Sequence, residues 1–232
     1  MPSEILINSN QREIRVALTE NNQVSELFIE HKTNKGIVGN IYLGKVTKIL
    51  PGMQVAFVDI GMEKAGFLYV GDIDVVDMLG LEDEIDPPPL ADDTDEPFAG
   101  KPGRPKHGIR IQDILQEGQE LLVQVAKNPL GTKGARITNY ISLPGRYLVY
   151  MPTVNHISVS RRIEEQDEKE QLRTLLSEIG NPGEGYIVRT AGQDATRADF
   201  DSDLKFLHQL WGNLKKQSEN LTAPHLVYED LN

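Results

Sequence analysis

The chain has 232 residues, of which 39% are hydrophobic, enough for a packed core in one large domain or two small ones. No apolar run reaches the ~18 residues that span a bilayer, and the start of the chain lacks a secretion signal, so we expect a cytoplasmic protein without a membrane partner. Because the sequence has no cysteine, it excludes disulfides and thiolate metal sites.

The net charge of −11 comes from one stretch of the chain. Eleven of the 35 acidic residues lie within 72–97, which has no Lys or Arg, and the other 24 acidic residues balance the 24 basic ones. The negative net charge of the whole chain therefore does not exclude basic patches that bind an anionic partner such as RNA.

The first predicted elements are strands within residues 4–30. Ile14, Val16 and Leu18 alternate with polar residues, and this period of two predicts a strand. The two asparagines at 21–22 then supply a turn, so residues 1–36 are predicted to hold a β-hairpin.

Short apolar segments broken by glycine and proline follow between Gly39 and Tyr69. This spacing is typical of a small β-barrel, which we place at residues 37–135. Within it, residues 72–109 combine acidic residues with prolines and glycines, which predicts a disordered insertion. An apolar strand at 121–126 is expected to close the barrel after this insertion.

A mixed α/β unit is predicted at 136–221. Apolar residues at helical spacing, with Gly180 and Pro182 after the first set, indicate two helices packed against strands. The expected elements are strands at 147–150 and 186–189 and helices over 164–179 and 201–220. The sequence as a whole therefore predicts an α+β fold.

Two aromatic residues, Phe57 and Phe67, lie on neighbouring predicted strands of the barrel. RNA bases stack on such rings, and each stacked base contributes ~1–3 kcal/mol with little sequence preference. Lys133 is expected at the barrel edge, where it would meet phosphate. The alternative is that both rings fill the barrel core, and their spacing alone does not separate these two interpretations.

Several collinear segments resemble the ribonuclease E/G family, and within it the ribonuclease G branch. They are Asn40-Ile-Tyr-Leu-Gly-Lys-Val, Leu50-Pro-Gly-Met-Gln-Val-Ala-Phe-Val-Asp-Ile-Gly, Asn128-Pro-Leu-Gly-Thr-Lys-Gly-Ala-Arg, Leu143-Pro-Gly-Arg-Tyr-Leu-Val-Tyr-Met-Pro, Ser160-Arg-Arg-Ile-Glu and Ile187-Val-Arg-Thr-Ala-Gly. The resemblance covers nearly the whole chain apart from the acidic stretch. It implies an S1-type OB-fold β-barrel inserted after the N-terminal β-hairpin, followed by a mixed α/β 5′-sensor unit that recognises the terminal monophosphate of an RNA.

Carried over by position, the resemblance assigns 5′-phosphate binding to Gly145, Arg189 and Thr190. The chemistry suits this role, because Arg189 can offer two parallel N–H donors to phosphate oxygens and the Thr190 hydroxyl adds another. Gly145 would allow the backbone to approach closely.

The resemblance adds three further residues to the same site. Val149 is expected to pack beneath the terminal nucleotide, and Arg161 and Arg162 are expected to hold the following phosphates. The alternative for the two arginines is a surface pair that bridges the Glu-rich helix behind them. The loop at 153–156 is given no site residue.

The hydrolytic site of the family uses aspartates that hold magnesium in segments such as Val-Asp-Ile-Asn-Thr-Gly, which this sequence does not contain. Asp59 lies in a similar-looking segment, but within the barrel motif, where it is expected to cap a turn. We therefore expect no catalytic residue, metal ligand or cofactor in this chain, and Mg²⁺ for the full-length family enzyme. Acidic pairs at 92–93 and 95–96 could hold a metal instead, although a solvated charge run is the simpler interpretation.

The expected function is the RNA-binding N-terminal part of a single-strand-specific endoribonuclease, inactive alone, that senses a 5′-monophosphate in rRNA processing and mRNA turnover. Its expected partner is single-stranded RNA with a 5′-monophosphate. Residues 222–232 are expected to begin a truncated segment that returns to the hairpin in a ribonuclease-H-like subdomain. One alternative is a non-catalytic subunit that forms a homo-oligomer or pairs with a separate catalytic chain. Another is a complete nuclease that uses other carboxylates.

Overall fold

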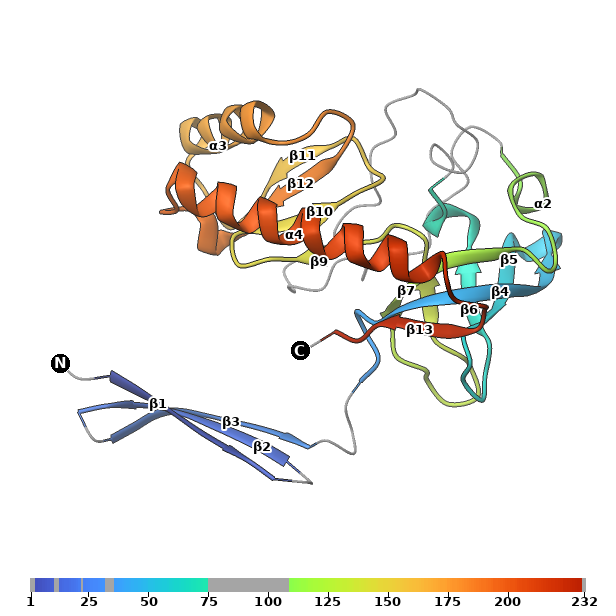
Figure 1. Ribbon diagram of the computed structural model, residues 1–232, viewed down its shortest axis with the longest axis horizontal. Coiled ribbons are helices and arrows are strands. Elements are labelled where there is room, and N and C mark those ends of the chain that lie inside the picture. The colour runs from blue at the N-terminus through green and yellow to red at the C-terminus, as the bar shows by residue number, and fades with distance from the viewer. Residues whose placement is uncertain (1–2, 11–12, 22, 32–35, 75–108, 231–232) are drawn as a thin grey trace. The chain divides into compact units, whose positions relative to one another are not determined.

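The computed structural model describes residues 3–10, 13–21, 23–31, 36–74 and 109–230 (Figure 1). The chain forms two compact units, Met1–Ile37 and Val38–Asn232. The predicted α+β fold class is confirmed, because a sheet unit is followed by a closed barrel and an α/β part with helices.

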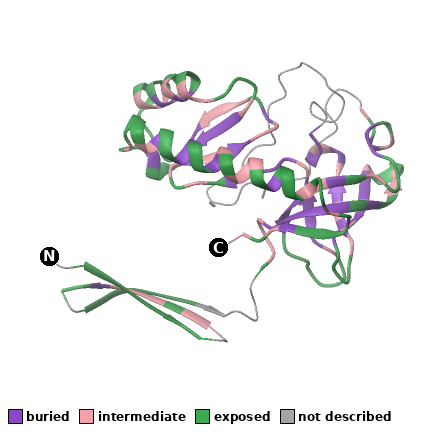
Figure 2. Ribbon diagram, viewed as in Figure 1, coloured by how far each residue is buried: buried purple, intermediate pink, exposed green. Residues whose placement is uncertain are grey.

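An antiparallel sheet in the order β1-β2-β3 makes the first unit. Asn21 has a φ of 52° in the turn between β2 and β3, a conformation that asparagine tolerates better than most residues. The predicted hairpin is therefore β2–β3, and β1 adds a third strand. Most of this unit is exposed (Figure 2). The strands are β1 (Ser3–Ser9), β2 (Glu13–Glu20) and β3 (Gln23–His31).

The barrel closes because its first and last strands in space, β4 and β7, pair with each other. The order is β4-β5-β6-β8-β7, with β6 and β8 parallel and the other neighbours antiparallel. Alternate residues along β5 point into the barrel, so Ala56 and Val58 are buried. The same alternation continues to Ile60, directly after the strand, which is also buried. The strands are β4 (Ile41–Leu50), β5 (Val55–Asp59), β6 (Gly66–Tyr69), β7 (Glu120–Lys127) and β8 (Arg136–Thr138).

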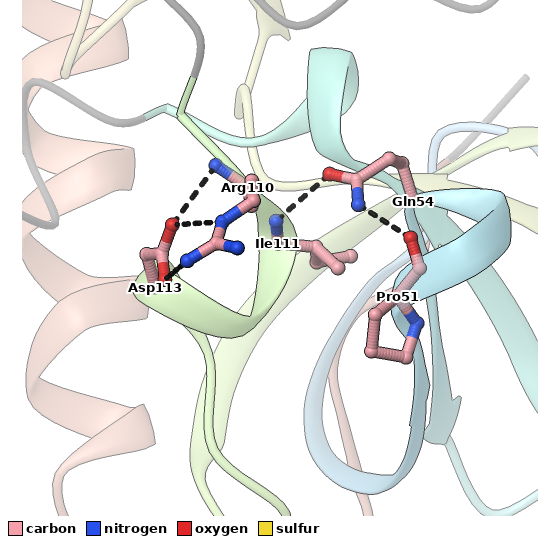
Figure 3. A network of polar contacts seen from close by, with 5 residues as sticks. All are labelled: Pro51, Gln54, Arg110, Ile111 and Asp113. Carbon is pink, nitrogen blue, oxygen red and sulfur yellow. Dashed lines mark hydrogen bonds and ion pairs between the residues drawn. The ribbon is translucent and has the colours of Figure 1, made fainter.

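The turn between β4 and β5 anchors the segment that leads into β7. Gln54 donates a hydrogen bond to the carbonyl of Pro51 and accepts one from the backbone N–H of Ile111, 3.0 Å away (Figure 3). Ile111 begins the short helix α2 (Ile111–Ile114), whose preceding Arg110 pairs with Asp113 at 3.0 Å. Regular structure therefore resumes with this short helix, before the strand expected at 121–126.

Two acidic residues at the start of the predicted insertion are buried, so that part of the prediction is wrong. Asp72 is 2% exposed and forms two hydrogen bonds of 2.9 and 3.0 Å with the guanidinium of Arg136, while Asp74 is 3% exposed. A charge run in the sequence could not separate these residues from solvated neighbours, because their burial depends on Arg136 in a distant strand. The rest of the predicted insertion, 75–108, lies outside the described residues.

The α/β part holds a four-stranded sheet in the order β11-β12-β10-β9. Helix α3 contacts β11, and helix α4 contacts β9 and β10. Leu172, Leu176, Phe200, Leu204 and Leu207 are buried in one core with Leu148, Tyr150, Tyr186 and Val188 of the sheet. The predicted helices are confirmed with small shifts at their ends. The elements are β9 (Leu143–Pro144), β10 (Leu148–Met151), β11 (Ile157–Val159), α3 (Gln166–Ile179), β12 (Gly185–Val188) and α4 (Arg197–Ser218).

Helix α4 begins four residues earlier than predicted because Thr196 and Asp199 form a capping box. We expect Thr196→Ala to lower the free energy of unfolding by about 1 kcal/mol. Hydrogen bonds from the Thr196 side chain and backbone lower the pKa of Asp199 in the folded state. The stability that ionised Asp199 adds is therefore fully present above the ordinary carboxyl pKa and is lost as the pH falls through the lowered pKa. Urea titration at neutral and acidic pH measures this cost, which should shrink in acid.

The matched control for this prediction is Thr174→Ala, at an exposed position inside α3. It should leave stability unchanged or raise it slightly, because alanine favours helix interiors. An equal loss in both variants would contradict the capping role of Thr196.

The last described strand, β13 (His225–Tyr228), joins the barrel sheet by pairing with β4. The backbone N–H of Asp230 also donates to the side chain of Asn40 at 2.9 Å. The expectation that residues 222–232 begin a segment that returns to the N-terminal hairpin stays a prediction.

Candidate functional site

One row of side chains crosses the outer face of the barrel from β4 to β8. In the strand registers, Lys48 lies opposite Phe57, Phe57 opposite Phe67, and Phe67 opposite Arg136. Phe57 and Phe67 are half-buried, whereas their neighbours in sequence are buried. The alternative that both rings fill the core is therefore wrong. They form an apolar surface with the exposed Lys48 at one end, while Arg136 at the other end is buried and paired with Asp72.

Tyr69 extends this surface and was not predicted as a site residue. Its ring meets the ring of Phe67 edge to face, with 5.6 Å between centroids, and the guanidinium of Arg136 lies 5.7 Å from its centre. The alternation along β6, in which Leu68 is buried between Phe67 and Tyr69, was the signal in the sequence that could have identified it.

Lys133 is exposed in the loop before β8, as expected for the barrel edge. Its backbone N–H donates to the carbonyl of Leu130, and Lys64 donates from its ammonium to the carbonyl of Gly131 at 2.8 Å. The two lysines thus belong to adjoining loops at one end of β6 and β8. Among the described contacts, none joins Lys133 to the aromatic row.

Asp59 ends β5 and accepts a hydrogen bond of 2.9 Å from the backbone N–H of Gly61. Gly61 has a φ of 80°, in the left-handed region that favours glycine. The expectation that Asp59 caps a turn is therefore confirmed.

A second group of predicted residues meets at the hairpin turn between β9 and β10. Arg189 follows the last residue of β12, and one guanidinium nitrogen donates to the carbonyl of Gly145 at 2.6 Å. The backbone N–H of Arg189 donates to the carbonyl of Tyr147 at 2.8 Å. Both hydrogen bonds fix Arg189 on the turn. A guanidinium has five N–H donors, so four besides the one that contacts Gly145 can serve a ligand.

Thr190 lies on the opposite side of Arg189 from this turn, next to β11. Its hydroxyl is 3.2 Å from the hydroxyl of Ser160, and the backbone N–H of Ser160 donates to Val188 at 2.8 Å. Ser160 was not predicted as a site residue, although it directly precedes the predicted Arg161. The structure therefore joins the Arg189 guanidinium to Gly145 and the Thr190 hydroxyl to Ser160, two contacts made by adjacent residues on opposite sides of the end of β12.

Arg161 and Arg162 follow Ser160 and are exposed. The backbone N–H of Arg162 donates to the Ser160 hydroxyl at 3.3 Å, so this short turn ties the arginine pair to the same corner of the sheet. Both the phosphate-binding interpretation and the surface-pair alternative remain open for their side chains.

Val149 lies on the face of the sheet that Arg189 also shares. Val149 pairs with Ile187 in register, and both pack with Met151 and Val154, away from the helices. Arg189 comes two residues after Ile187 in extended backbone, with φ −77° and ψ 162°, so its side chain starts from the same face. An apolar side chain and a guanidinium thus flank the turn at Gly145.

The described residues do not provide a fit for the magnesium ion that the family resemblance implies. Within them, no three His, Asp or Glu side chains gather closely enough to hold a metal ion. No helix in the described part of the chain is long and apolar enough to cross a membrane.

Comparisons with known proteins all point to ribonucleases of types E and G. Residues 142–232 match the model of the Ribonuclease E/G family. The chain is 39% identical over 231 residues to ribonuclease G of Salmonella typhimurium (strain SL1344) and 38% identical to that of Escherichia coli (strain K12), covering all of this chain and 44% of each relative. It is also 39% identical over 229 residues to ribonuclease E of Haemophilus influenzae, covering 97% of this chain and 22% of that protein.

The chain therefore spans less than half the length of the curated ribonucleases G that it matches. The matched family region contains the Gly145 turn, Ser160, Arg189 and Thr190, and the alignment with ribonuclease G also extends over the barrel and the first sheet. By this family match over residues 142–232 and by alignments that cover 97% or more of this chain, the chain belongs to the ribonuclease E/G family.

Proposed function

We propose that this chain is the RNA-binding part of a ribonuclease G/E-type, single-strand-specific endoribonuclease, and that it recognises the 5′-monophosphate of its RNA. The observation that carries the proposal is the guanidinium of Arg189, held 2.6 Å from the carbonyl of Gly145 and followed directly by Thr190. Similarity to ribonucleases supports RNA as the ligand, and the geometry at Arg189 supports the 5′-phosphate as the group that is recognised.

The chemistry of the corner suits a terminal phosphate. A monophosphate at an RNA end carries more charge than an internal phosphodiester and has three terminal oxygens that accept hydrogen bonds. The guanidinium of Arg189 supplies a planar pair of donors, and the next residue, Thr190, adds a hydroxyl that lies 3.2 Å from that of Ser160. Val149 offers an apolar contact for the first nucleotide on the same face of the sheet.

The barrel would bind the strand that follows. Phe57, Phe67 and Tyr69 present three aromatic rings on one outer face, and unpaired bases stack on such rings. Lys48 and Lys133 are exposed cations of this barrel and would meet phosphates. Because a duplex buries its bases in the stack, this surface favours single-stranded RNA.

Binding of 3′-fluorescein-labelled oligonucleotides that differ only in their 5′ end tests the proposal. Fluorescence anisotropy should give a lower Kd for the 5′-monophosphate than for the 5′-hydroxyl oligonucleotide. A duplex of the same sequence should bind more weakly than either single strand. Equal Kd values for the two single strands would remove the 5′-phosphate assignment, and a tighter duplex would remove the single-strand assignment.

Removing the barrel rings should weaken binding of all single strands. We expect Phe57→Ala and Phe67→Ala each to cost about 1–3 kcal/mol of binding free energy, with similar losses for oligo(U) and oligo(A), because stacking requires no particular base. The ratio of Kd values for the two 5′ ends should not change, since the rings do not touch the terminal phosphate. Anisotropy titrations of both homopolymers provide the measurement.

Phe206→Ala is the matched control for these variants. Phe206 is 59% exposed on α4, so it offers a phenylalanine outside the barrel. Its loss should leave all Kd values unchanged. If it weakens RNA binding as much as the barrel variants do, the proposed stacking surface is wrong.

We propose rRNA processing and mRNA turnover in the cytoplasm as the setting of the longer enzyme, on the basis of the family resemblance. Hydrolysis in the family is expected to need Mg²⁺. No step through a metal follows from this chain, because the described residues do not provide a fit for it.

A second candidate function is that of an interaction subunit, and the first sheet favours it. Seven large apolar side chains of β1 and β3 are more than half exposed, which is unusual for a unit that functions alone. They are Ile5, Leu6, Ile7, Val24, Leu27, Phe28 and Ile29. Light scattering after size exclusion should then show dimers or larger species that Phe28→Ser reduces. A monomer at every concentration would contradict this candidate.

A further inference from the structure

A buried carboxylate on helix α4 gathers the backbone of the turn that holds Arg189. Asp203 is 9% exposed. One of its oxygens accepts from the N–H of Arg146 at 3.1 Å, and the other accepts from the N–H groups of Tyr147 and Leu148 at 2.8 and 3.0 Å. Three consecutive backbone donors on one carboxylate fix the conformation of the turn more tightly than its single cross-turn bond from Gly145 to Leu148.

Glycine at position 145 is what lets this carboxylate approach. A Cβ atom there would lie 2.6 Å from both oxygens of Asp203, closer than atoms of this kind can approach. The φ of Gly145 is not in the left-handed region, so the reason for glycine is space rather than backbone conformation. The close approach that the family resemblance implies for phosphate is made in the structure by Asp203.

The other side of the same turn holds Arg189. The carbonyl of Gly145 accepts from the guanidinium, and the carbonyl of Tyr147 accepts from the backbone N–H of Arg189. The N–H groups of the turn thus point to the helix carboxylate while two of its carbonyls point to the arginine. A shift of the turn relative to α4 would move the hydrogen-bond acceptor that orients the guanidinium.

We propose that Asp203 is a positioning residue for the 5′-phosphate site, acting through the turn at 145–148 on Arg189. This inference rests on the proposed function, since it concerns the same site. Asp203 does not itself bind phosphate, because a carboxylate repels that anion, and its oxygens already accept three backbone N–H groups. Helix α4 thereby sets the geometry with which the RNA end is recognised.

Asp203→Asn tests the inference with little change in shape. The amide replaces one acceptor oxygen with a donor, so at least one N–H group of the turn loses its acceptor. The ratio of Kd values between 5′-hydroxyl and 5′-monophosphate oligonucleotides should fall roughly 10-fold, the scale on which residues that orient a binding group act. The Kd of the 5′-hydroxyl oligonucleotide should not change, whereas general unfolding would weaken the binding of both. Asp201→Asn, at an exposed acid on the same helix, should leave both Kd values unchanged.

A double variant separates positioning from a merely structural role. In an Arg189→Ala background, Asp203→Asn should reduce the 5′-end preference no further, because Asp203 acts only through Arg189. If Asp203→Asn keeps the full preference while Arg189→Ala loses it, the inference is overturned and the proposed function stands. If the unaltered chain shows no preference, the proposed function itself fails.

Should Asp203→Asn unfold below the assay temperature, Gly145→Ala disturbs the same contact from the turn. The added methyl group must displace the carboxylate, so the 5′-end preference should fall while the Kd of the 5′-hydroxyl oligonucleotide remains. A folded Gly145→Ala variant with full preference would also overturn the inference. Melting curves by circular dichroism establish which variants are folded.

Discussion

Arg189→Ala should abolish the preference for a 5′-monophosphate, with a loss of roughly 10- to 100-fold in Kd for the monophosphorylated oligonucleotide and little change for the 5′-hydroxyl one. The reason is that hydrogen bonds to charged groups contribute about 1.5–3 kcal/mol, and the guanidinium of Arg189 is held in place by Gly145 before any RNA binds. Alanine removes both the charge and the paired donors. Anisotropy titrations with the two oligonucleotides measure the ratio directly.

Two further variants make this prediction specific. Arg189→Lys keeps the positive charge but not the planar pair of donors, so it should recover only part of the preference. Arg197→Ala removes an exposed arginine that pairs with Glu178 at 2.9 Å and should leave the preference intact. An Arg189→Ala variant that still distinguishes the two ends would exclude Arg189 from the site.

Removing Arg136 should cause the largest loss of stability. Its side chain and that of Asp72 are 9% and 3% exposed and are joined by two hydrogen bonds of 2.9 and 3.0 Å. Arg136→Met leaves the carboxylate of Asp72 buried without its cation, for which the expected cost is about 3–5 kcal/mol. Urea denaturation followed by circular dichroism measures this loss in the free energy of unfolding.

The pH dependence of this loss has a defined sign. Burial raises the pKa of Asp72, and Arg136 opposes that rise through its hydrogen bond and its charge. Without Arg136 the folded pKa should rise further above the unfolded value, so the folded state binds the proton more tightly and stability recovers as the pH falls through that value. The difference between Arg136→Met and the unaltered chain should therefore be largest at neutral pH and smaller in acid.

A double variant and an exposed pair serve as controls for this prediction. Arg136→Met combined with Asp72→Asn should lose less stability than Arg136→Met alone, because no buried charge remains. Arg173→Met, in a surface pair with Glu170, should cost no more than about 1 kcal/mol. Equal losses at both arginines would contradict the role of the buried pair.

Local pattern predicted the barrel and the helices well, because each depends on the spacing of apolar residues. The alternation around Phe57 and Phe67 predicted strands, and the spacing of Leu204, Leu207 and Leu214 predicted the buried stripe of α4. What this pattern could not give is the side of the barrel on which each ring lies. That depends on the register across β4, β5 and β6, which the closure of the barrel determines.

The phosphate site shows the same division. The family resemblance assigned Gly145, Arg189 and Thr190; in the structure Arg189 contacts Gly145, while Thr190 contacts Ser160. It could not assign Asp203, because that residue is separated from the turn by more than 50 positions and lies within an ordinary helical pattern. The burial of Asp72 was not predicted because Asp72 begins an acidic stretch of the sequence that looks solvated throughout. Its partner, Arg136, lies in a strand far along the chain.

The most direct test of the central claim is nuclear magnetic resonance of the ¹⁵N-labelled chain with dinucleotides that carry either a 5′-monophosphate or a 5′-hydroxyl. The monophosphate should shift the amide signals of Gly145, Ser160, Arg189 and Thr190 most strongly, and the hydroxyl dinucleotide should leave these signals nearly unchanged. Identical shifts with both dinucleotides, or shifts that avoid these four amides, would contradict the claim.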